Sequence, residues 1–127
     1  SCLVMSPPDR AMRTANGRPA TYRIIPRIVA RQREVAEAEG CAFFDTYATM
    51  GGEGSAARWR YRRPVLMGGD LTHPTDAGAE VIGRALFDSL MAGYGRSRAG
   101  AAGASTSDQA GPDAGPEPDA TAAAASR

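Results

Sequence analysis

Blocks of apolar residues alternate with polar segments over the first 94 residues, and they predict two short strands. Cys2–Met5 is a continuous apolar run that Ser6-Pro7-Pro8 ends, and Cys41–Asp45 is a second such run. A run that is apolar on both faces is typical of a strand buried on both sides, as in a parallel sheet. Between Pro7 and Pro19 the sequence predicts a loop, with Asn16-Gly17 as its turn.

The segment between the two strands, Tyr22–Glu39, has the apolar spacing of a helix. We expect Thr21 to cap its start, Pro26 to fit only near its first turn, and Gly40 to end it. The residues of the apolar face are Ile25, Ile28, Val29, Gln32, Val35 and Ala36. The order strand, helix, strand has the length of a right-handed parallel crossover.

Two short helices are predicted after the second strand. Thr46–Met50 is one helical turn, which Gly51-Gly52 ends, and Ser55–Tyr61 is a second helix with Ser55 as its cap. The last helix is expected over Thr75–Ala92. Its apolar face consists of Gly78, Val81, Ile82, Ala85, Leu86, Ser89 and Leu90, and its end is expected at Gly93 and Gly95.

These elements make an incomplete core, because two parallel strands with their helices cannot bury enough apolar surface alone. The sequence therefore predicts an α/β domain of which residues 1–94 form only a C-terminal portion. The residues 95–127 contain no Ile, Leu, Val, Met, Phe, Trp or Tyr. Such a segment cannot offset roughly 1–2 kcal/mol of backbone entropy per ordered residue, so we expect a disordered tail there.

Composition and charge exclude several classes of protein. Fifteen Arg, no Lys and fourteen acidic residues give a net charge of +1, which argues against a nucleic-acid partner. No apolar run approaches the roughly 18 residues of a membrane span. No secretory leader is visible, and the chain starts at Ser1, so the sequence itself leaves the compartment open. No cofactor is expected.

The two cysteines, Cys2 and Cys41, fall in the two predicted strands. Two cysteines do not make a disulfide scaffold. Adjacent parallel strands seldom place a pair at the geometry that a disulfide needs. We therefore expect two buried, unreactive thiols.

The one histidine, His73, lies in the segment Gly68-Gly69-Asp70-Leu71-Thr72-His73-Pro74-Thr75. An acid three residues before a His, in a short loop that enters a helix, can fold its carboxylate onto one imidazole nitrogen. The other nitrogen is then free to act as a general base. One alternative is a loop or helix-capping His beside a solvated Asp70. A metal site is a second, although two ligands without another His or a nearby Cys make a poor one.

The Asp-Leu-Thr-His-Pro-Thr run and the Ala-Gly-Ala-Glu-Val-Ile-Gly-Arg-Ala-Leu that follows resemble the last conserved block of the GDSL (SGNH) esterase and acylhydrolase family. The strand that ends in Pro-Pro-Asp-Arg and the strand that ends in Phe-Asp-Thr are similar as well. The resemblance implies the C-terminal half of a three-layer α/β/α flavodoxin-like fold. It implies ester hydrolysis through an acyl-enzyme, with His73 as general base, Asp70 as its orienting partner and Gly78 as the point of close helix packing.

The family's nucleophilic Ser and its oxyanion-hole Gly and Asn belong to blocks that these 127 residues do not include. Phe87-Asp88-Ser89-Leu90 looks like a Gly-Asp-Ser-Leu block, but it falls within the last predicted helix. A nucleophile needs an exposed turn with free backbone N–H groups, so Ser89 is not expected to attack. Ser6 could edge the site, without a motif to support it. The alternative function is a non-catalytic remnant or interaction module that keeps the fold.

The Gly51–Trp59 segment is similar to the subset of this family that deacetylates cell-wall sugars. In that case Trp59 stacks on a sugar face and Arg58 holds a carboxylate. The alternative is that Trp59 packs under the loop and Arg58 is solvated. For Arg60, Arg62 and Arg63, solvated surface is the first interpretation and an anionic glycan contact the second. The implied substrate is an acylated small molecule or a carbohydrate such as peptidoglycan, and the implied compartment is the periplasm or cell envelope.

Overall fold

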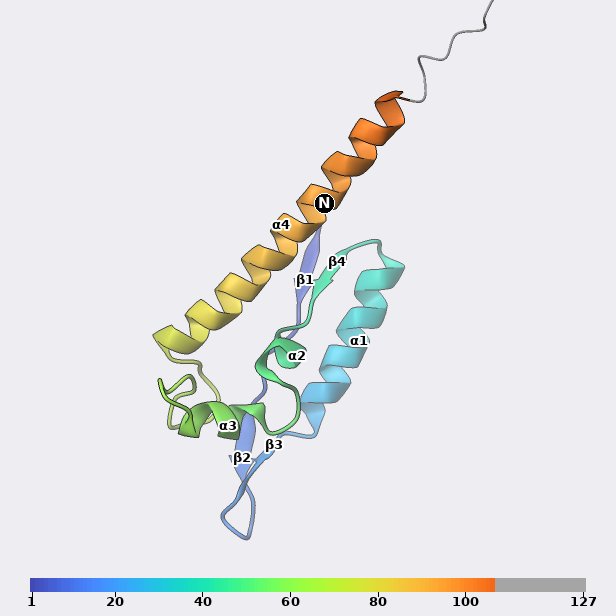
Figure 1. The fold of residues 1–127 in the computed structure, drawn as a ribbon. Coiled ribbons are helices and arrows are strands. Elements are labelled where there is room, and N and C mark those ends of the chain that lie inside the picture. Colours follow the sequence, from blue (N-terminus) through green and yellow to red (C-terminus); the bar gives the residue numbers. More distant parts are fainter. Residues whose placement is uncertain (107–127) are drawn as a thin grey trace, which may run out of the picture. The chain divides into compact units, whose positions relative to one another are not determined.

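A computed structural model describes residues 1–106 (Figure 1). The elements in chain order are β1 (Leu3–Met5), β2 (Ala11–Arg13), β3 (Pro19–Thr21), α1 (Ile24–Ala38), β4 (Ala42–Phe44), α2 (Thr46–Met50), α3 (Ser55–Tyr61) and α4 (Asp76–Thr106). The described residues fall into two units, of which the first is Ser1–Ala92 and the second begins at Gly93. The four strands of residues 1–106 all belong to the first unit. The tail expected over 95–127 lies outside the described residues from 107 onward.

Strands β1 and β4 form the predicted parallel pair, with helix α1 between them along the chain. In their register Leu3 lies opposite Ala42 and Met5 opposite Phe44. Helix α1 packs on both strands through an apolar stripe whose buried members are Ile25, Val29 and Ala36. The strand, helix, strand order read from the periodicity is therefore confirmed.

The start of α1 differs from the expectation. Arg23 occupies the N-cap position and makes no capping hydrogen bond through its side chain. The Thr21 hydroxyl is used elsewhere: it donates to Asp9 Oδ2 at 3.1 Å and accepts from the backbone N–H of Gly54 at 2.7 Å. The Thr21 hydroxyl therefore binds Asp9 and Gly54, which are distant in sequence, and does not cap α1 as its position before the helix had suggested.

A β-hairpin replaces the loop predicted between Pro7 and Pro19. Strands β2 and β3 pair in antiparallel fashion, with Ala11 opposite Thr21 and Arg13 opposite Pro19. The turn at Asn16-Gly17 is confirmed, but the loop around it is wrong. Strands of three residues are too short to show an apolar alternation, so the pattern gives no sign of the pairing.

The described sheets are small, and β1 is not buried on both faces as predicted. Leu3 is 40% exposed and Met5 43% exposed, whereas Phe44 on β4 is buried. The reason is that β1 pairs with β4 alone in a two-stranded sheet. The mixed α/β class is thus confirmed at the level of its elements, in four strands and four helices among residues 1–106.

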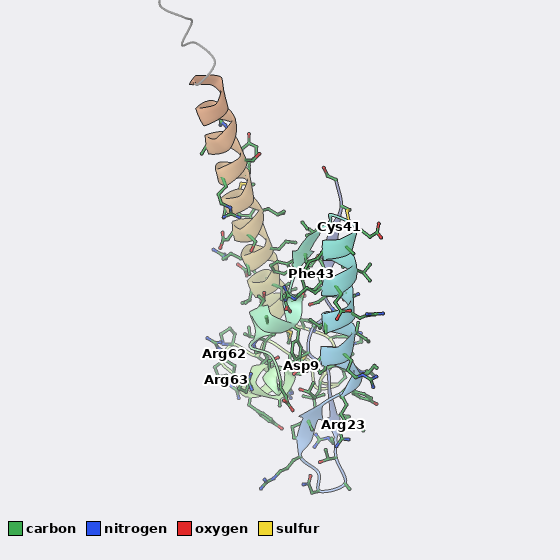
Figure 2. All side chains as sticks on the ribbon, turned by 90° about the vertical axis from the view of Figure 1, so that its right-hand side faces the viewer. Asp9, Arg23, Cys41, Phe43, Arg62 and Arg63 are labelled. Atoms are coloured by element: carbon green, nitrogen blue, oxygen red, sulfur yellow. A yellow bond between two sulfur atoms is a disulfide. The ribbon has the colours of Figure 1, made fainter. Side chains whose placement is uncertain are left out.

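The prediction of two free thiols is wrong, because Cys2 and Cys41 form a disulfide. Their Cα atoms are 4.9 Å apart, and the Ala42 backbone N–H donates to the Cys2 carbonyl at 3.0 Å. The two residues immediately precede the paired residues Leu3 and Ala42, so the register brings them face to face just outside the ladder. Cys2 is exposed and Cys41, labelled in Figure 2, is half-buried, so neither has the burial expected of it.

The main hydrophobic core lies around α3 and the segment that follows it. Its buried members are Ala11, Met50, Ala56, Trp59, Leu66, Met67 and Leu71, with Ala77 and Ile82 packed against them. A Cβ atom placed on Gly78 would lie 2.0 Å from the Leu66 carbonyl oxygen. The expectation that Gly78 permits close packing of the last helix is therefore confirmed.

Helix α4 continues to Thr106, so the expected end at Gly93 and Gly95 is wrong. A glycine ends a helix when it adopts a left-handed backbone conformation. Neither glycine has a positive φ, and Gly95 has open space around it. Among residues 1–106, no helix combines the length and apolar character that a membrane crossing requires.

Candidate active site

The Asp70–His73 loop is closed at its base by backbone hydrogen bonds. Met67 and Pro74 form an isolated antiparallel bridge. The Gly68 N–H donates to the His73 carbonyl at 2.8 Å, and the Thr75 N–H donates to the Leu66 carbonyl at 3.0 Å. The two ends of the loop are therefore held together next to the buried residues Leu66 and Met67.

Leu71 anchors the middle of this loop to the core. Its side chain is buried, and its carbonyl oxygen accepts from the Ala11 N–H at 2.9 Å. Its φ is +56°, a left-handed conformation that costs a residue with a side chain about 1–2 kcal/mol. The burial and the hydrogen bond offset that cost. With Leu71 held inward, Asp70 and His73 are left on the exposed side of the loop.

Asp70 and His73 form the hydrogen-bonded pair that their spacing predicts. Asp70 Oδ2 lies 2.6 Å from His73 Nδ1. The other carboxylate oxygen, Oδ1, accepts from the backbone N–H groups of Thr72 at 3.0 Å and His73 at 3.1 Å. Three groups of the same loop, two backbone N–H groups and the imidazole, thus hold the carboxylate in one orientation without a substrate.

These hydrogen bonds lower the pKa of Asp70 to about 2, with the His73 side chain as the largest cause and the two backbone N–H groups next. The carboxylate is therefore ionised at neutral pH and accepts the Nδ1 proton of the imidazole. Nε2 is then the nitrogen with a free lone pair. The His73 side chain is 82% exposed and that of Asp70 51% exposed, so Nε2 is open to a reactant.

His73 does not cap the helix, which was one alternative for its role. The Thr75 hydroxyl accepts from the Gly78 N–H at 3.2 Å and so caps the start of α4, as predicted.

The loop also depends on the missing side chain of Gly68. A Cβ at this position would lie 3.0 Å from the His73 carbonyl oxygen and 3.1 Å from Asp70 Oδ1. In the part of the chain that is described, no three His, Cys, Asp or Glu side chains group where they could hold a metal ion.

Arg58 is turned onto its own loop. Its Nη2 donates to the Gly51 carbonyl at 2.7 Å and its Nη1 to the Glu53 carbonyl at 2.8 Å. The guanidinium therefore ties the Gly51–Gly54 loop to α3. Arg58 is also exposed, which agrees with the alternative of a solvated side chain, and its part in holding a carboxylate stays a prediction.

Trp59 is 5% exposed and belongs to the hydrophobic core together with Met50, Leu66 and Met67. A ring covered by core side chains has no face to offer a sugar. Stacking on a substrate is therefore wrong for Trp59, and the alternative, packing under the loop, is confirmed. Tyr61, two residues further along α3, is the aromatic residue of this helix that is exposed.

Asp9 is a buried acid that sequence reasoning did not single out. Its Oδ2 accepts from the Ala56 N–H at 2.8 Å, the Thr21 hydroxyl at 3.1 Å and the Ser55 hydroxyl at 3.2 Å. Gly54, and not Ser55, occupies the N-cap position of α3, so Asp9 supplies the acceptor that this helix start needs. The only sequence signal is an acid directly after Pro7-Pro8, and it does not reveal partners 47 residues away.

The serines that sequence reasoning considered are not placed to attack a substrate. Ser6 is buried, and its hydroxyl accepts from the Tyr47 N–H at 3.2 Å and donates to Asp45 Oδ1 at 3.3 Å. It thereby holds the start of α2. Ser89 lies inside α4, as expected. Among the residues described, His73 has no hydrogen bond to a serine hydroxyl.

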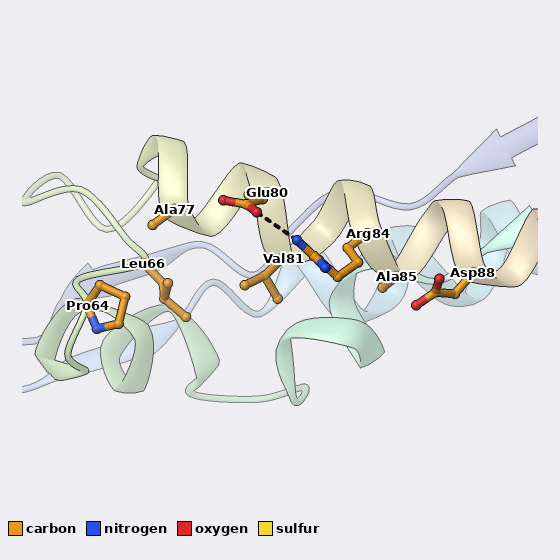
Figure 3. Close-up of a pocket in the computed structure, with 8 residues that line it drawn as sticks. All are labelled: Pro64, Leu66, Ala77, Glu80, Val81, Arg84, Ala85 and Asp88. Atoms are coloured by element: carbon orange, nitrogen blue, oxygen red, sulfur yellow. Dashed lines mark hydrogen bonds and ion pairs between the residues drawn. The ribbon is translucent and has the colours of Figure 1, made fainter.

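A pocket of about 420 Å³ lies along one side of α4 (Figure 3). Its lining comprises Pro64, Leu66, Ala77, Glu80, Val81, Arg84, Ala85 and Asp88. Arg84 donates to Glu80 across part of it at 2.9 Å. Neither Asp70 nor His73 lines this pocket, so it is separate from the pair.

Comparisons with protein families, curated proteins and solved structures find no match to this chain. The geometry of the Asp70–His73 loop is therefore the main evidence about its chemistry. The loop supplies an ionised carboxylate, an imidazole oriented by it and an exposed ring nitrogen. This combination suits general acid–base work on a group that approaches from solvent.

Proposed function

We propose that residues 1–94 are the C-terminal half of a GDSL/SGNH-type serine ester hydrolase with a flavodoxin-like three-layer fold. The enzyme removes O-acyl groups from a carbohydrate such as peptidoglycan. The observation that carries the proposal is the 2.6 Å contact between Asp70 Oδ2 and His73 Nδ1, on a closed loop with the imidazole exposed. The resemblance of that loop to the last block of the family supports it.

In the proposed reaction His73 Nε2 takes the proton of a serine hydroxyl while the serine oxygen attacks the acyl carbonyl carbon. Asp70 stabilises the imidazolium that forms and keeps the ring oriented. The imidazolium then donates its proton to the leaving alcohol oxygen as the ester bond breaks. Water repeats the sequence on the acyl-enzyme, which releases the acid and the free serine. The serine and the oxyanion donors come from polypeptide outside these 127 residues.

Exposed apolar side chains support the view that this unit is part of a larger domain. Leu3 and Met5 on β1 are exposed, as are Ile24 and Val35 on α1. A parallel sheet is normally covered on both faces and has more than two strands. Further strands and helices of the same domain would bury these side chains.

The Cys2–Cys41 disulfide supports a compartment outside the cytoplasm. Disulfides persist in the periplasm and at cell surfaces and are rare where thiol reductants are abundant. We therefore place the enzyme in the periplasm or cell envelope, where an O-acylated wall polymer is present.

The test is acetate release by the complete reading frame that contains these residues, with 4-nitrophenyl acetate and O-acetylated peptidoglycan as substrates. His73→Ala should lower kcat by about 10³-fold, and Asp70→Asn should also lower it strongly. Asp88→Asn, the same change at an exposed position of α4, is the matched control and should retain activity. Full activity of His73→Ala would refute the proposal.

The alternative is a non-catalytic module that keeps the fold. The observation that favours it is that these 127 residues contain no Gly-Asp-Ser block. A fluorophosphonate probe separates the two functions, because it labels an activated serine covalently. Labelling of the complete reading frame that His73→Ala abolishes supports the hydrolase, and no labelling supports the module.

A further inference from the structure

The residues Arg60, Tyr61, Arg62 and Arg63, here called the basic segment, lie at the end of α3 and directly after it. Arg62 and Arg63, labelled in Figure 2, are exposed, and Tyr61 is 70% exposed. Among residues 1–106, none of the three guanidinium groups forms an ion pair, and their one hydrogen bond runs from Arg63 Nη1 to the Arg62 carbonyl. Three positive charges and an aromatic ring thus lie together without an acidic partner.

The basic segment lies against the loop that carries Asp70 and His73. The Leu66 N–H donates to the Trp59 carbonyl at 3.0 Å, which closes the chain around the segment. The Asp70–His73 loop begins immediately afterwards, at the Met67–Pro74 bridge. A Cβ placed on Gly69 would lie 4.0 Å from Arg60 Nε, so this guanidinium lies near the residue that precedes Asp70.

Asp70 does not neutralise the basic segment. Its Oδ2 is bound to His73 Nδ1, and its Oδ1 accepts two backbone N–H groups. The guanidinium of Arg58, by contrast, already donates hydrogen bonds to the Gly51 and Glu53 carbonyls. The charges of the basic segment left for a ligand are therefore those of Arg60, Arg62 and Arg63, and Arg60 is the one that lies next to the Asp70–His73 loop.

We propose that the basic segment is a subsite for an anionic sugar, so that the ester substrate is a carbohydrate with a carboxylate or phosphate near its acyl group. Tyr61 offers its ring to the apolar face of the sugar, and the guanidinium groups bind the anion through paired N–H donors. This inference rests on the proposed function for its link to catalysis. The binding itself can be measured without catalysis.

A sugar fits the basic segment better than a nucleic acid does. Sites for single-stranded nucleic acid combine a long positive groove with several stacking aromatics. The basic segment has one exposed aromatic residue within four positions, and the chain carries a net charge of only +1. Binding of RNA is therefore an outcome that would overturn the proposal.

The binding test follows the Arg Nε–H signals of the 127-residue chain by NMR. The probes are methyl glucuronoside, glucose 1-phosphate and, as the neutral control, methyl glucoside. We expect one or both anionic sugars to shift the Arg60 signal, with an affinity that falls as NaCl is added. A response to both anions, or to one alone, tells which anionic group the subsite takes.

Variants assign the binding to the basic segment. Arg60→Gln should weaken binding of the anionic sugar by about tenfold, and Tyr61→Leu should weaken it as well. Arg27→Gln on α1 and Tyr94→Leu on α4, the same changes at exposed positions outside the basic segment, should leave it unchanged. The proposal is overturned by equal responses to neutral and anionic sugars, by equal effects of Arg27→Gln and Arg60→Gln, or by tighter binding of a short labelled RNA.

The activity test uses the complete reading frame with O-acetylated methyl glucuronoside and with the methyl ester of the same compound. Acetate release should favour the free carboxylate, and Arg60→Gln should abolish that preference. Arg27→Gln should keep both the preference and the two rates. Equal rates of the parent enzyme on the two compounds, with hydrolysis that still depends on His73, refute the subsite alone. Hydrolysis that survives His73→Ala refutes the proposed function alone, since sugar binding is measured separately.

Discussion

At the scale of single residues, the Asp70 carboxylate shows how a short loop sets the chemistry of a side chain. One of its oxygens is bound to the His73 imidazole, and the other accepts two backbone N–H groups of the same loop. Each contact favours the ionised acid. The carboxylate is therefore in the form that orients an imidazole, although both side chains are largely in solvent.

The first prediction concerns the pKa of Asp70, which is lowered from 3.8 to about 2. A carboxyl group whose pKa is lower in the folded state stabilises the fold above its unfolded pKa, and that contribution is lost as the pH falls toward 2. His73→Ala should raise the pKa of Asp70 toward 3.8, because it removes the largest cause of the shift. The Asp70 Cγ chemical shift, followed by NMR against pH, measures this. An unchanged midpoint in His73→Ala would contradict the assignment.

The second prediction concerns Asp9, which is buried and holds three donors from two segments that are distant in sequence. Asp9→Ala leaves the Ala56 N–H and two hydroxyl groups without their acceptor. We expect the free energy of unfolding to fall by about 2–3 kcal/mol, measured by urea denaturation. Asp88→Ala, at an exposed position, should change it by less than about 0.5 kcal/mol. Equal changes in the free energy of unfolding for the two variants would show that the hydrogen bonds of Asp9 do not stabilise the fold.

At the scale of elements, the contact between α4 and the segment before the Asp70–His73 loop depends on one missing side chain. Gly78 lies in the first turns of α4, where a Cβ would meet the Leu66 carbonyl oxygen at 2.0 Å. The helix can approach this closely only because position 78 has no side chain. This close approach packs α4 against Leu66, directly before the Met67–Pro74 bridge at which the Asp70–His73 loop begins.

The third prediction compares two glycines of that helix. Gly78→Ala forces α4 away from Leu66 and should lower the free energy of unfolding by at least about 2 kcal/mol. Gly83→Ala, where nothing lies within 4 Å, should raise it by as much as about 1 kcal/mol through helix propensity. Thermal unfolding followed by circular dichroism measures both. A stabilising Gly78→Ala would contradict the close packing.

Helices and contacts that depend on neighbouring residues could be predicted from the sequence. The hairpin and the side-chain contacts that depend on residues far away in the sequence could not. The helices α1, α2 and α3 follow from apolar spacing and nearby glycines, and the Asp70–His73 pair joins residues only three positions apart. The β2–β3 hairpin and the contacts of Asp9 depend on partners that no local pattern identifies. Arg58 and Trp59 illustrate the same limit, because spacing cannot tell a side chain that faces a ligand from one that faces its own fold.

At the scale of the whole molecule, the main covalent feature is the Cys2–Cys41 disulfide, which joins the first strand of the chain to the strand after α1. Its two residues are 39 positions apart, so it restricts a large part of the unfolded unit. The sequence could not reveal it, since it depends on the register of β1 and β4. The pair lies just before the first ladder residues, Leu3 and Ala42, where the general rule about parallel strands does not apply.

The fourth prediction is that this disulfide contributes about 3–4 kcal/mol to the free energy of unfolding, from the chain entropy of a closed loop of this size. The double variant Cys2→Ser/Cys41→Ser should lose that amount in urea denaturation. Reduction by a phosphine should lower the stability of the parent chain by the same amount and leave the variant unaffected. Equal stability of the oxidised and reduced parent would contradict the prediction.

The same disulfide makes a covalent ring of the chain from Cys2 to Cys41, and that ring contains the exposed tip of the β2–β3 hairpin. A protease that cuts this tip opens the ring but does not divide the molecule. The two pieces stay joined through sulfur, and β1 stays beside β4. Such a nicked molecule separates into two pieces only when the disulfide is reduced, so the backbone of this hairpin can be cut once while the unit stays covalently connected.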